Sequence, residues 1–275
     1  MVSKIGKSGD QEIYLRLDDT TDLKFGKNGF LDLILKITNY GFVVCTEFSL
    51  EQRNLLLRHD VDFDLQCALE LAIREFEMRI KSHFFFLSSS PYYELESKEV
   101  KNRIKEIRNL GHVIGLHYDA SKEKEESFEI QKSTLEDCLE ISIKLFSQHN
   151  PSINGFSRNI SHKSATDVME LNKNFKPIYM SDSNMSPRRN FHSTLQDEDN
   201  IHLLLHPEYW VSEILNFKDF ERFMFSRLPE NLNENFSEHL SLMKNTLRDR
   251  ESLDLENSNL NTDSLHDFQN DENLG

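Results

Sequence analysis

The sequence contains few cysteines and no long apolar run. Its three cysteines, Cys45, Cys67 and Cys138, lie far apart, which argues against a disulfide framework and favours buried thiols in a reducing compartment. No stretch approaches the roughly 18 consecutive apolar residues of a membrane span. The first residues also lack the apolar core of a secretion signal. These absences predict a cytoplasmic protein without a membrane span.

Basic residues are scarce relative to acidic ones. There are 32 Lys and Arg against 47 Asp and Glu, which gives a formal net charge of -15. This surplus argues against nucleic acid and anionic lipid as main partners. Residues 251–275 contribute acids and no Lys or Arg. We predict a polar lead-in at 1–27, one α/β domain at 28–248 with helices at its end, and an acidic, disordered tail at 249–275.

Short apolar runs alternate with helical patterns along most of the chain. Runs this apolar are typical of strands buried on both faces of a parallel sheet. Their alternation with helices favours βα units, and we predict a closed or nearly closed, distorted (β/α) barrel of the α/β class. The predicted strands cover 12–17, 54–59, 82–90, 112–118, 153–157, 177–181 and 201–205, and the predicted helices cover 29–42, 65–79, 97–111, 125–147, 165–172, 217–225 and 236–247.

Polar side chains gather where the predicted strands end. Asp60 and Asp62 are two residues apart, so the pleat directs both to one face of the sheet. His117 and Asp119 share a face by the same rule. His206 is followed by a proline, which ends the last strand. Because reactive groups of parallel α/β folds lie at the carboxyl ends of the strands, these side chains predict a site there.

Two converging carboxylates in a buried place need a cation or a shared proton. A zinc-type ion takes imidazole and carboxylate ligands and leaves a position open for water. A second carboxylate accepts the proton of that water, and a histidine opposite protonates the leaving group. The pattern predicts hydrolysis of an amide or ester. By contrast, Asp64 is predicted to cap the helix at 65–79, and His59 is predicted to be a packed strand histidine.

Four segments carry a family resemblance. RHDVD at 58–62, GHVIGLHYD at 111–119, SDS at 181–183 and LLLHPEYW at 203–210 resemble the ordered motifs of the polysaccharide deacetylases, metal-dependent carbohydrate esterases on a distorted (β/α) barrel. The resemblance implies a hydrolase that binds a divalent metal, zinc first and cobalt, nickel or iron otherwise. The implied roles are Asp60 as the base, Asp62 and His117 as metal ligands, Arg158 as the arginine that steadies the base, His206 as the histidine acid and Asp182 as the carboxylate that tunes it.

The chain departs from the family at the second histidine ligand. That histidine normally follows the first by four residues, and here the position is Ser121, a poor zinc ligand. Asp119 shares the inward face with His117 and is predicted as the replacement ligand, with His162 as the other candidate. A site with only two protein ligands would bind metal weakly.

The resemblance and the lack of a secretion signal together predict a deacetylase of an N-acetylated sugar or of a nucleotide-linked or lipid-linked glycan precursor. One alternative is an inactive carbohydrate-binding protein on the same barrel. Another is a phosphohydrolase using His59 and Asp60 as a metal-binding pair, although strand parity points these two residues to opposite faces. Tyr92 and Tyr93 are candidates for stacking on a sugar ring, whereas Trp210 is predicted to pack in the core or at the rim.

Overall fold

The computed structural model describes residues 24–124, 126–150, 162–187, 189–214 and 216–245. The strands predicted at 12–17 and 153–157, the lead-in up to residue 23 and the acidic tail lie outside the described residues.

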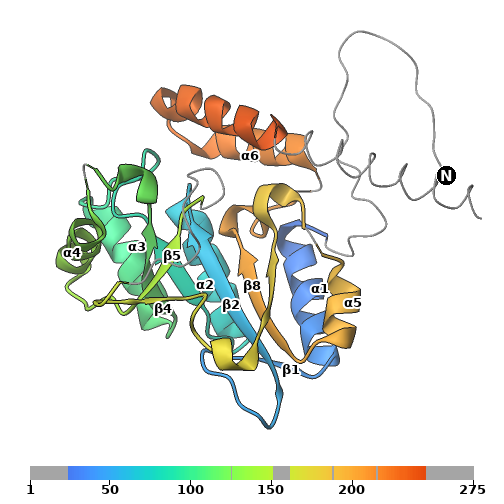
Figure 1. Ribbon diagram of the computed structural model, residues 1–275. Helices are drawn as coiled ribbons and strands as arrows, with labels where there is room; N and C mark the ends of the chain where they lie inside the picture. Colours follow the sequence, from blue (N-terminus) through green and yellow to red (C-terminus); the bar gives the residue numbers. More distant parts are fainter. Residues whose placement is uncertain (1–23, 125, 151–161, 188, 215, 246–275) are drawn as a thin grey trace, which may run out of the picture.

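A curled parallel sheet forms the centre of the described chain (Figure 1). Its strand order is β6-β5-β4-β3-β2-β8-β7, and β1 pairs with the start of β2. Within the described chain β6 and β7 do not pair with each other, so the sheet is a half-barrel. The strands are β1 (Phe42–Val44), β2 (Arg53–Val61), β3 (His83–Phe86), β4 (Val113–Tyr118), β5 (Leu145–Gln148), β6 (Thr166–Asp167), β7 (Ile178–Ser181) and β8 (Asn200–Leu205).

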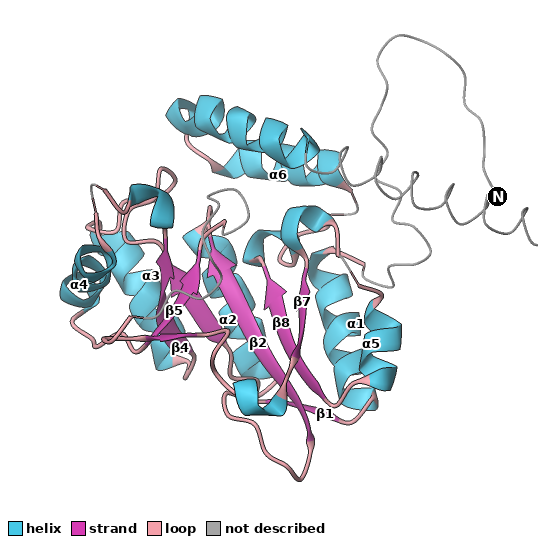
Figure 2. Ribbon diagram, in the orientation of Figure 1, coloured by secondary structure: helices cyan, strands magenta, loops and turns pink. Residues whose placement is uncertain are grey.

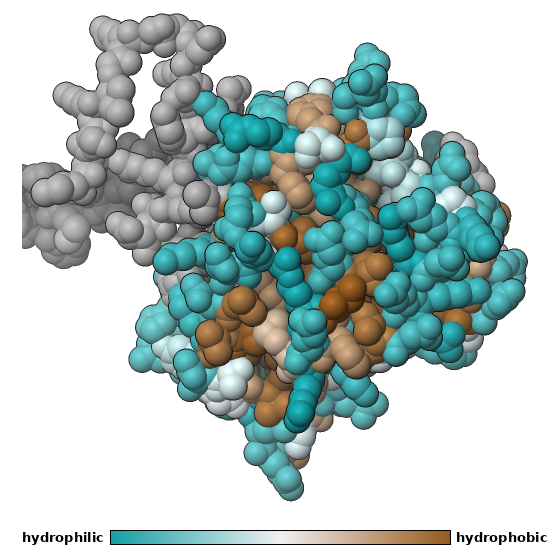
Figure 3. Space-filling model, turned by 180° about the vertical axis from the view of Figure 1, so that it is seen from behind, coloured by the Kyte–Doolittle hydropathy of each residue, from teal (hydrophilic) through white to brown (hydrophobic). Residues whose placement is uncertain are grey.

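Helices cover the outer face of the sheet and the ends of its strands. In Figure 2 the strands stand in front of α2 and α3, while α6 and the helix formed by residues 233–245 lie above the strand ends. Seen from behind, the helical face is mostly hydrophilic with small apolar areas between polar side chains (Figure 3). The helices are α1 (Gly26–Asn39), α2 (Leu65–Glu77), α3 (Lys98–Asn109), α4 (Phe128–Leu139), α5 (Phe191–Asp197) and α6 (Phe217–Arg227).

Local signals explain where several helices begin and end. The Asp64 carboxylate accepts hydrogen bonds from the first backbone N–H groups of α2, which confirms the predicted cap. Ser97 caps α3 in the same way. After α3 the chain turns at Gly111, whose φ of +96° lies in the region that favours glycine.

The two faces of the sheet carry different side chains. On the outer face, Phe84 and Phe86 of β3 are fully buried against the helices. On the inner face, Phe85 packs with Leu56. Gly115 of β4 lies beside Phe85, and a β-carbon at Gly115 would come within 2.3 Å of a carbon of that ring. The glycine is therefore needed for this close packing below the strand ends.

Two of the predicted helices are wrong. The segment 125–147 is not one helix: α4 ends at Leu139, and β5 follows. Glu140 adopts φ of 56°, and the Glu136 side chain accepts a hydrogen bond from the Ile143 backbone N–H, so the chain turns without glycine or proline. The segment 165–172 contains the short strand β6 instead of a helix, because Asp167 turns the chain by accepting from the Met169 backbone.

Candidate metal centre

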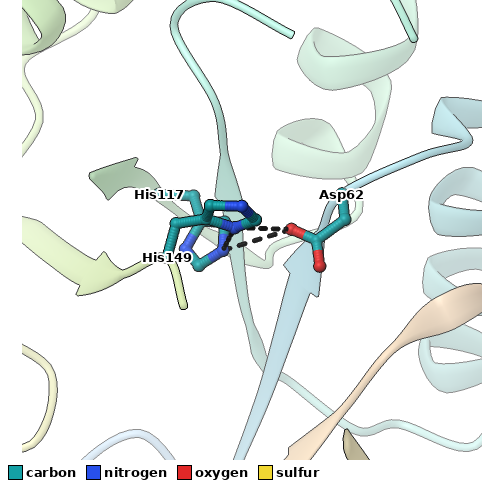
Figure 4. Close-up of side chains that lie close together, drawn as sticks. All are labelled: Asp62, His117 and His149. Carbon is teal, nitrogen blue, oxygen red and sulfur yellow. Dashed lines mark hydrogen bonds and ion pairs between the residues drawn. The ribbon is translucent and has the colours of Figure 1, made fainter. Parts of the chain in front are cut away.

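Three side chains from β2, β4 and β5 or their ends meet at the carboxyl end of the sheet (Figure 4). Asp62 directly follows β2, His117 lies on β4, and His149 directly follows β5. His117 pairs in register with Ser147, and His149 is two residues further on, so strand parity turns it to the same inner face. The backbone N–H of His149 donates to the carbonyl of Tyr118 at 2.8 Å, which holds His149 beside β4.

The three ligand atoms form a nearly equilateral triangle. His117 Nε2 lies 3.2 Å from Asp62 Oδ1, His149 Nδ1 lies 3.3 Å from the same oxygen, and the two nitrogens are 3.1 Å apart. Ligands about 2.0–2.1 Å from a tetrahedral zinc ion are separated by about 3.3 Å. The triangle therefore has the dimensions that a zinc-type ion requires.

The Asp62 oxygen of this triangle, Oδ1, is buried and has no hydrogen-bond partner among the residues that the structure describes. Buried polar atoms are almost always satisfied, and here two imidazole nitrogens approach the oxygen without forming a hydrogen bond of good geometry. A carboxylate oxygen and two imidazole nitrogens form a donor set suited to a divalent metal. The residues present fit a metal ion.

The charges of the group are strongly coupled. Burial raises the pKa of Asp62, but the imidazoles of His149 and His117 outweigh burial and hold this pKa well below its usual value. Burial lowers the pKa of His149, but the Asp62 carboxylate outweighs burial, so the net pKa is raised. The raised pKa favours a proton on His149 beside the Asp62 carboxylate. A bound metal would take the place of that proton as the positive partner of the carboxylate.

A second layer of side chains orients His117. Its Nδ1 lies 2.7 Å from Ser147 Oγ, and that hydroxyl donates to Asp60 Oδ1 at 3.0 Å. Arg58 donates to both oxygens of Asp60, at 2.9 and 2.6 Å. Burial alone would raise the pKa of Asp60, but the Arg58 guanidinium outweighs it and the pKa is lowered. Asp60 is therefore a fixed anion that is linked through Ser147 to the His117 ring.

His206 faces the group from β8. Its Nδ1 lies 2.6 Å from Asp182 Oδ1, and its Nε2 lies 3.8 Å from Asp62 Oδ2. Asp182 is fully buried and also accepts from the Trp210 indole N–H at 2.7 Å. Burial opposes the imidazolium, but the Asp182 carboxylate raises the pKa of His206 to about 10. A pKa in this range keeps His206 protonated at neutral pH, with its Nε2 proton on the side of Asp62.

The residues predicted to replace the missing histidine lie elsewhere. The Asp119 Oδ1 atom accepts from both the backbone and the hydroxyl of Ser121, as the cap of the short helical turn Ala120–Lys122. The His162 ring stacks on Phe128 at 3.5 Å between ring centroids. Neither Asp119 nor His162 belongs to the metal-sized group found in the described part of the chain. Arg158 lies outside the described residues.

Sequence reasoning missed His149, Ser147 and the role of Arg58. His149 and Ser147 were hidden by the predicted helix at 125–147. The signal that could have revealed them is the group of apolar residues Ile143, Leu145 and Phe146, followed by Ser, Gln and His as polar residues follow the other strands. Arg58 could have been found from parity, since it is two residues before Asp60 on the same strand and therefore on the same face.

The predicted parity of His59 is confirmed. Its Nε2 lies 2.7 Å from Glu75 of α2, on the outer face and away from Asp60. Glu75 also accepts from Ser82, whose hydroxyl contacts His112 at 3.0 Å. His59 and His112 thus belong to a buried network between sheet and helix, and the metal-binding pair of the phosphohydrolase alternative does not form.

Comparisons with known proteins give a limited result. No protein-family model and no curated protein matches the chain. Among solved structures, the chain is similar to a family 4 carbohydrate esterase from Bacillus anthracis, with 11% identity, 72% of this chain and 82% of that chain covered, and a TM-score of 0.36. It is similar to the catalytic domain of a peptidoglycan N-acetylglucosamine deacetylase from Eubacterium rectale, with 14% identity, 60% and 81% covered, and a TM-score of 0.37.

A third similar structure is a family 4 acetyl xylan esterase from Clostridium thermocellum in complex with a cobalt ion, with 13% identity, 63% and 84% covered, and a TM-score of 0.35. All three are carbohydrate esterases or deacetylases, the class that the sequence motifs resemble. Likeness at this level leaves the activity to be inferred from the site itself. Among the described helices, none is both long and apolar enough to span a bilayer.

Proposed function

We propose that the protein is a metal-dependent hydrolase that removes an acetyl group from an amino sugar or a glycan precursor, with Asp62, His117 and His149 as the metal ligands. The triangle formed by the buried Asp62 oxygen and the two imidazole nitrogens carries this proposal. His149 takes the place of the histidine that the sequence lacks at Ser121. The zinc ion expected here, or a cobalt, nickel or iron ion in its place, would lower the pKa of a bound water and polarise the acyl oxygen.

The protein groups supply the proton transfers. Asp60 is a buried anion whose Oδ2 lies 3.9 Å from His117 Nδ1, and it is proposed as the proton acceptor. Its pair with Arg58 keeps it ionised throughout the neutral range. On the opposite side, His206 holds a proton at Nε2 and is proposed to give it to the leaving nitrogen. Asp182 maintains this charged form through its bond to Nδ1. Two groups with pKa values moved apart in this way suit an acid and a base.

The substrate class follows from the motifs and from the chemistry of the site. The opposed anion and imidazolium suit cleavage of an amide, whose nitrogen must be protonated to leave. The cytoplasmic location predicted from the sequence favours a sugar precursor, nucleotide-linked or lipid-linked, over finished polymer. A carbohydrate-binding protein without activity would not require a protonated His206 opposite a three-ligand group.

Metal content and acetate release test the proposal. The purified chain, stripped and then reconstituted with zinc, cobalt, nickel or ferrous iron, should bind about one ion and release acetate from an N-acetylated amino sugar. Asp62→Ala, His117→Ala and His149→Ala should lose the ion, whereas Asp60→Asn should retain the ion and lose turnover. The proposal is wrong if the reconstituted protein binds no metal, or if it binds metal and releases no acetate.

Asp119→Asn is the matched variant for the third ligand. It keeps an oxygen that can cap the turn at Ser121 but removes the charge. We expect metal binding to persist in Asp119→Asn and to fail in His149→Ala. The reverse result would return the third ligand to Asp119.

A further inference from the structure

The helix of residues 233–245 lies over the strand ends that carry the site (Figure 1). Phe63, the residue after Asp62, is 3% exposed. Its ring centroid lies 4.9 Å from that of Tyr92, 5.6 Å from that of Phe236 and 4.7 Å from that of His239. The helix therefore packs directly on the residue next to a proposed metal ligand.

This helix is firmly attached to the core. Phe236 is fully buried, and its ring packs on Phe220 and Phe225 of the α6 helix at 6.1 and 5.3 Å between centroids. Tyr92 Oη donates to the backbone carbonyl of Asn235 at 3.5 Å. The buried apolar side chains of this helix belong to the same core cluster as those of α1 and β8. Such packing makes the helix a fixed part of the fold rather than a mobile lid.

Two observations connect His239 of this helix with the site. Its ring packs on Phe63 and remains partly exposed. Burial lowers the pKa of His239, and the charges of Asp62, His149 and His206 all act on it. His239 lies outside the motifs at residues 58–210, so the resemblance assigns it no role.

We propose that His239 and Tyr92 form one wall of the sugar-binding site, and that the helix carrying His239 blocks a long glycan from passing over Asp62 on this side. The protein would then accept a single amino sugar or the end of a short chain, and not the middle of a polymer. This inference deepens the proposed function and rests on it for the identity of the sugar. An aromatic ring and a neutral imidazole suit the wall of a sugar site, because the ring contacts sugar C–H groups and the imidazole bonds to hydroxyls.

Sugar binding by the metal-free full chain tests the wall without depending on turnover. N-acetylglucosamine and its linear dimer, tetramer and hexamer are titrated by calorimetry. Affinity should rise up to the dimer and not beyond it. His239→Ala should weaken binding of the dimer about fivefold, the value of roughly one such contact. The control His192→Ala, on α5 beside Tyr40, should bind as the parent does.

A second variant protects the test against misfolding of the helix. Tyr92→Leu removes the other half of the wall from a different element, the loop after β3, and should also weaken binding of the dimer. Affinity that rises steadily to the hexamer overturns the inference. Parent-like binding by both His239→Ala and Tyr92→Leu, or no binding of any of these sugars by the parent, does the same.

Acetate release from the same sugars by the reconstituted protein separates this inference from the proposed function. Length-limited binding that is weakened in His239→Ala, together with no acetate release, supports the wall and rejects hydrolysis. Acetate release that is faster on the hexamer than on the dimer supports hydrolysis and rejects the wall.

Discussion

Replacing Glu208 by glutamine should stabilise the protein at neutral pH. Glu208 follows His206 in the short helical turn Pro207–Tyr209 and is 1% exposed. Neither of its carboxylate oxygens has a hydrogen-bond partner in another described residue. Burial raises the pKa of Glu208 from 4.5 to about 8. The folded protein therefore keeps Glu208 protonated at pH 7, whereas the unfolded chain ionises it.

The size and sign of the effect follow from linkage. Below pH 4.5 the carboxyl is protonated in both states and contributes nothing to the pH dependence. As the pH rises from 4.5 towards 8, only the unfolded state releases the proton, so the free energy of unfolding falls. Over the about 2.5 pH units up to pH 7, at about 1.36 kcal/mol each, the loss is about 3 kcal/mol. Glutamine has a similar shape and does not ionise, so Glu208→Gln should recover this amount.

Thermal and urea unfolding at two pH values provide the assay. At pH 7 a gain of about 3 kcal/mol should raise the Tm of Glu208→Gln by about 6–12 °C, while at pH 4 the variant and the parent should differ little. Glu106→Gln, at an exposed position of α3, is the matched control and should change the Tm at neither pH. Equal shifts of Glu208→Gln at pH 4 and pH 7, or destabilisation at pH 7, would refute the reasoning.

Three further substitutions test the inner face of the sheet. Ser147→Ala breaks the link behind the His117 ligand and should lower metal affinity about 10- to 100-fold, as measured by competition with a chromophoric chelator. Arg58→Met leaves Asp60 as an unpaired buried charge and should cost about 3–5 kcal/mol in urea unfolding at pH 7, a loss that shrinks as the pH falls and the buried carboxyl is protonated. Gly115→Ala places a β-carbon 2.3 Å from a ring carbon of Phe85 on the adjacent strand. It should lower the free energy of unfolding, measured in urea, by about 1–3 kcal/mol and leave the metal affinity unchanged. A parent-like value in any of the three would contradict the corresponding contact.

The sequence predicted the fold best where apolar runs were long and helix caps were clear. β2 and α2 lie where the leucine run and the Asp64 cap predicted them, and β8 is formed by the last apolar run. The predicted distorted (β/α) barrel is confirmed in the form of a curled, parallel half-barrel. How far the sheet closes could not be predicted, because the pairing of edge strands depends on contacts between segments far apart in the sequence. β5 was missed for a local reason: Glu140 adopts the left-handed conformation without the glycine that usually marks such a turn.

The candidate site was predicted where it follows from strand parity. Asp62 and His117 were expected to meet at one ion, and their ligand atoms lie 3.2 Å apart. His149, the proposed third ligand, could not be derived, because its position depends on assigning the strand before it. Asp119 satisfied the same parity rule as His117, but its carboxylate is used by the turn that follows β4. Parity predicts the face of a strand on which a side chain lies. It does not show whether that side chain forms hydrogen bonds with the chain beyond the strand end, as Asp119 does.

Two buried carboxylates are fixed by several hydrogen bonds each: Asp182, the partner of the acid candidate His206, and Asp60, the base candidate. Asp182 receives a backbone N–H, an indole N–H and the His206 ring, so it has no freedom to turn away from His206. Asp60 is held by Arg58 and Ser147 in the same way. A carboxylate held so strongly is a weak base, because the groups that fix it also lower its pKa. Such a weak base is useful only if the position of Asp60 matters more for the reaction than its basicity. The hydrogen bonds from Asp60 through Ser147 to the His117 ring favour this interpretation. One rigid arrangement orients both a proposed metal ligand and the proposed proton acceptor.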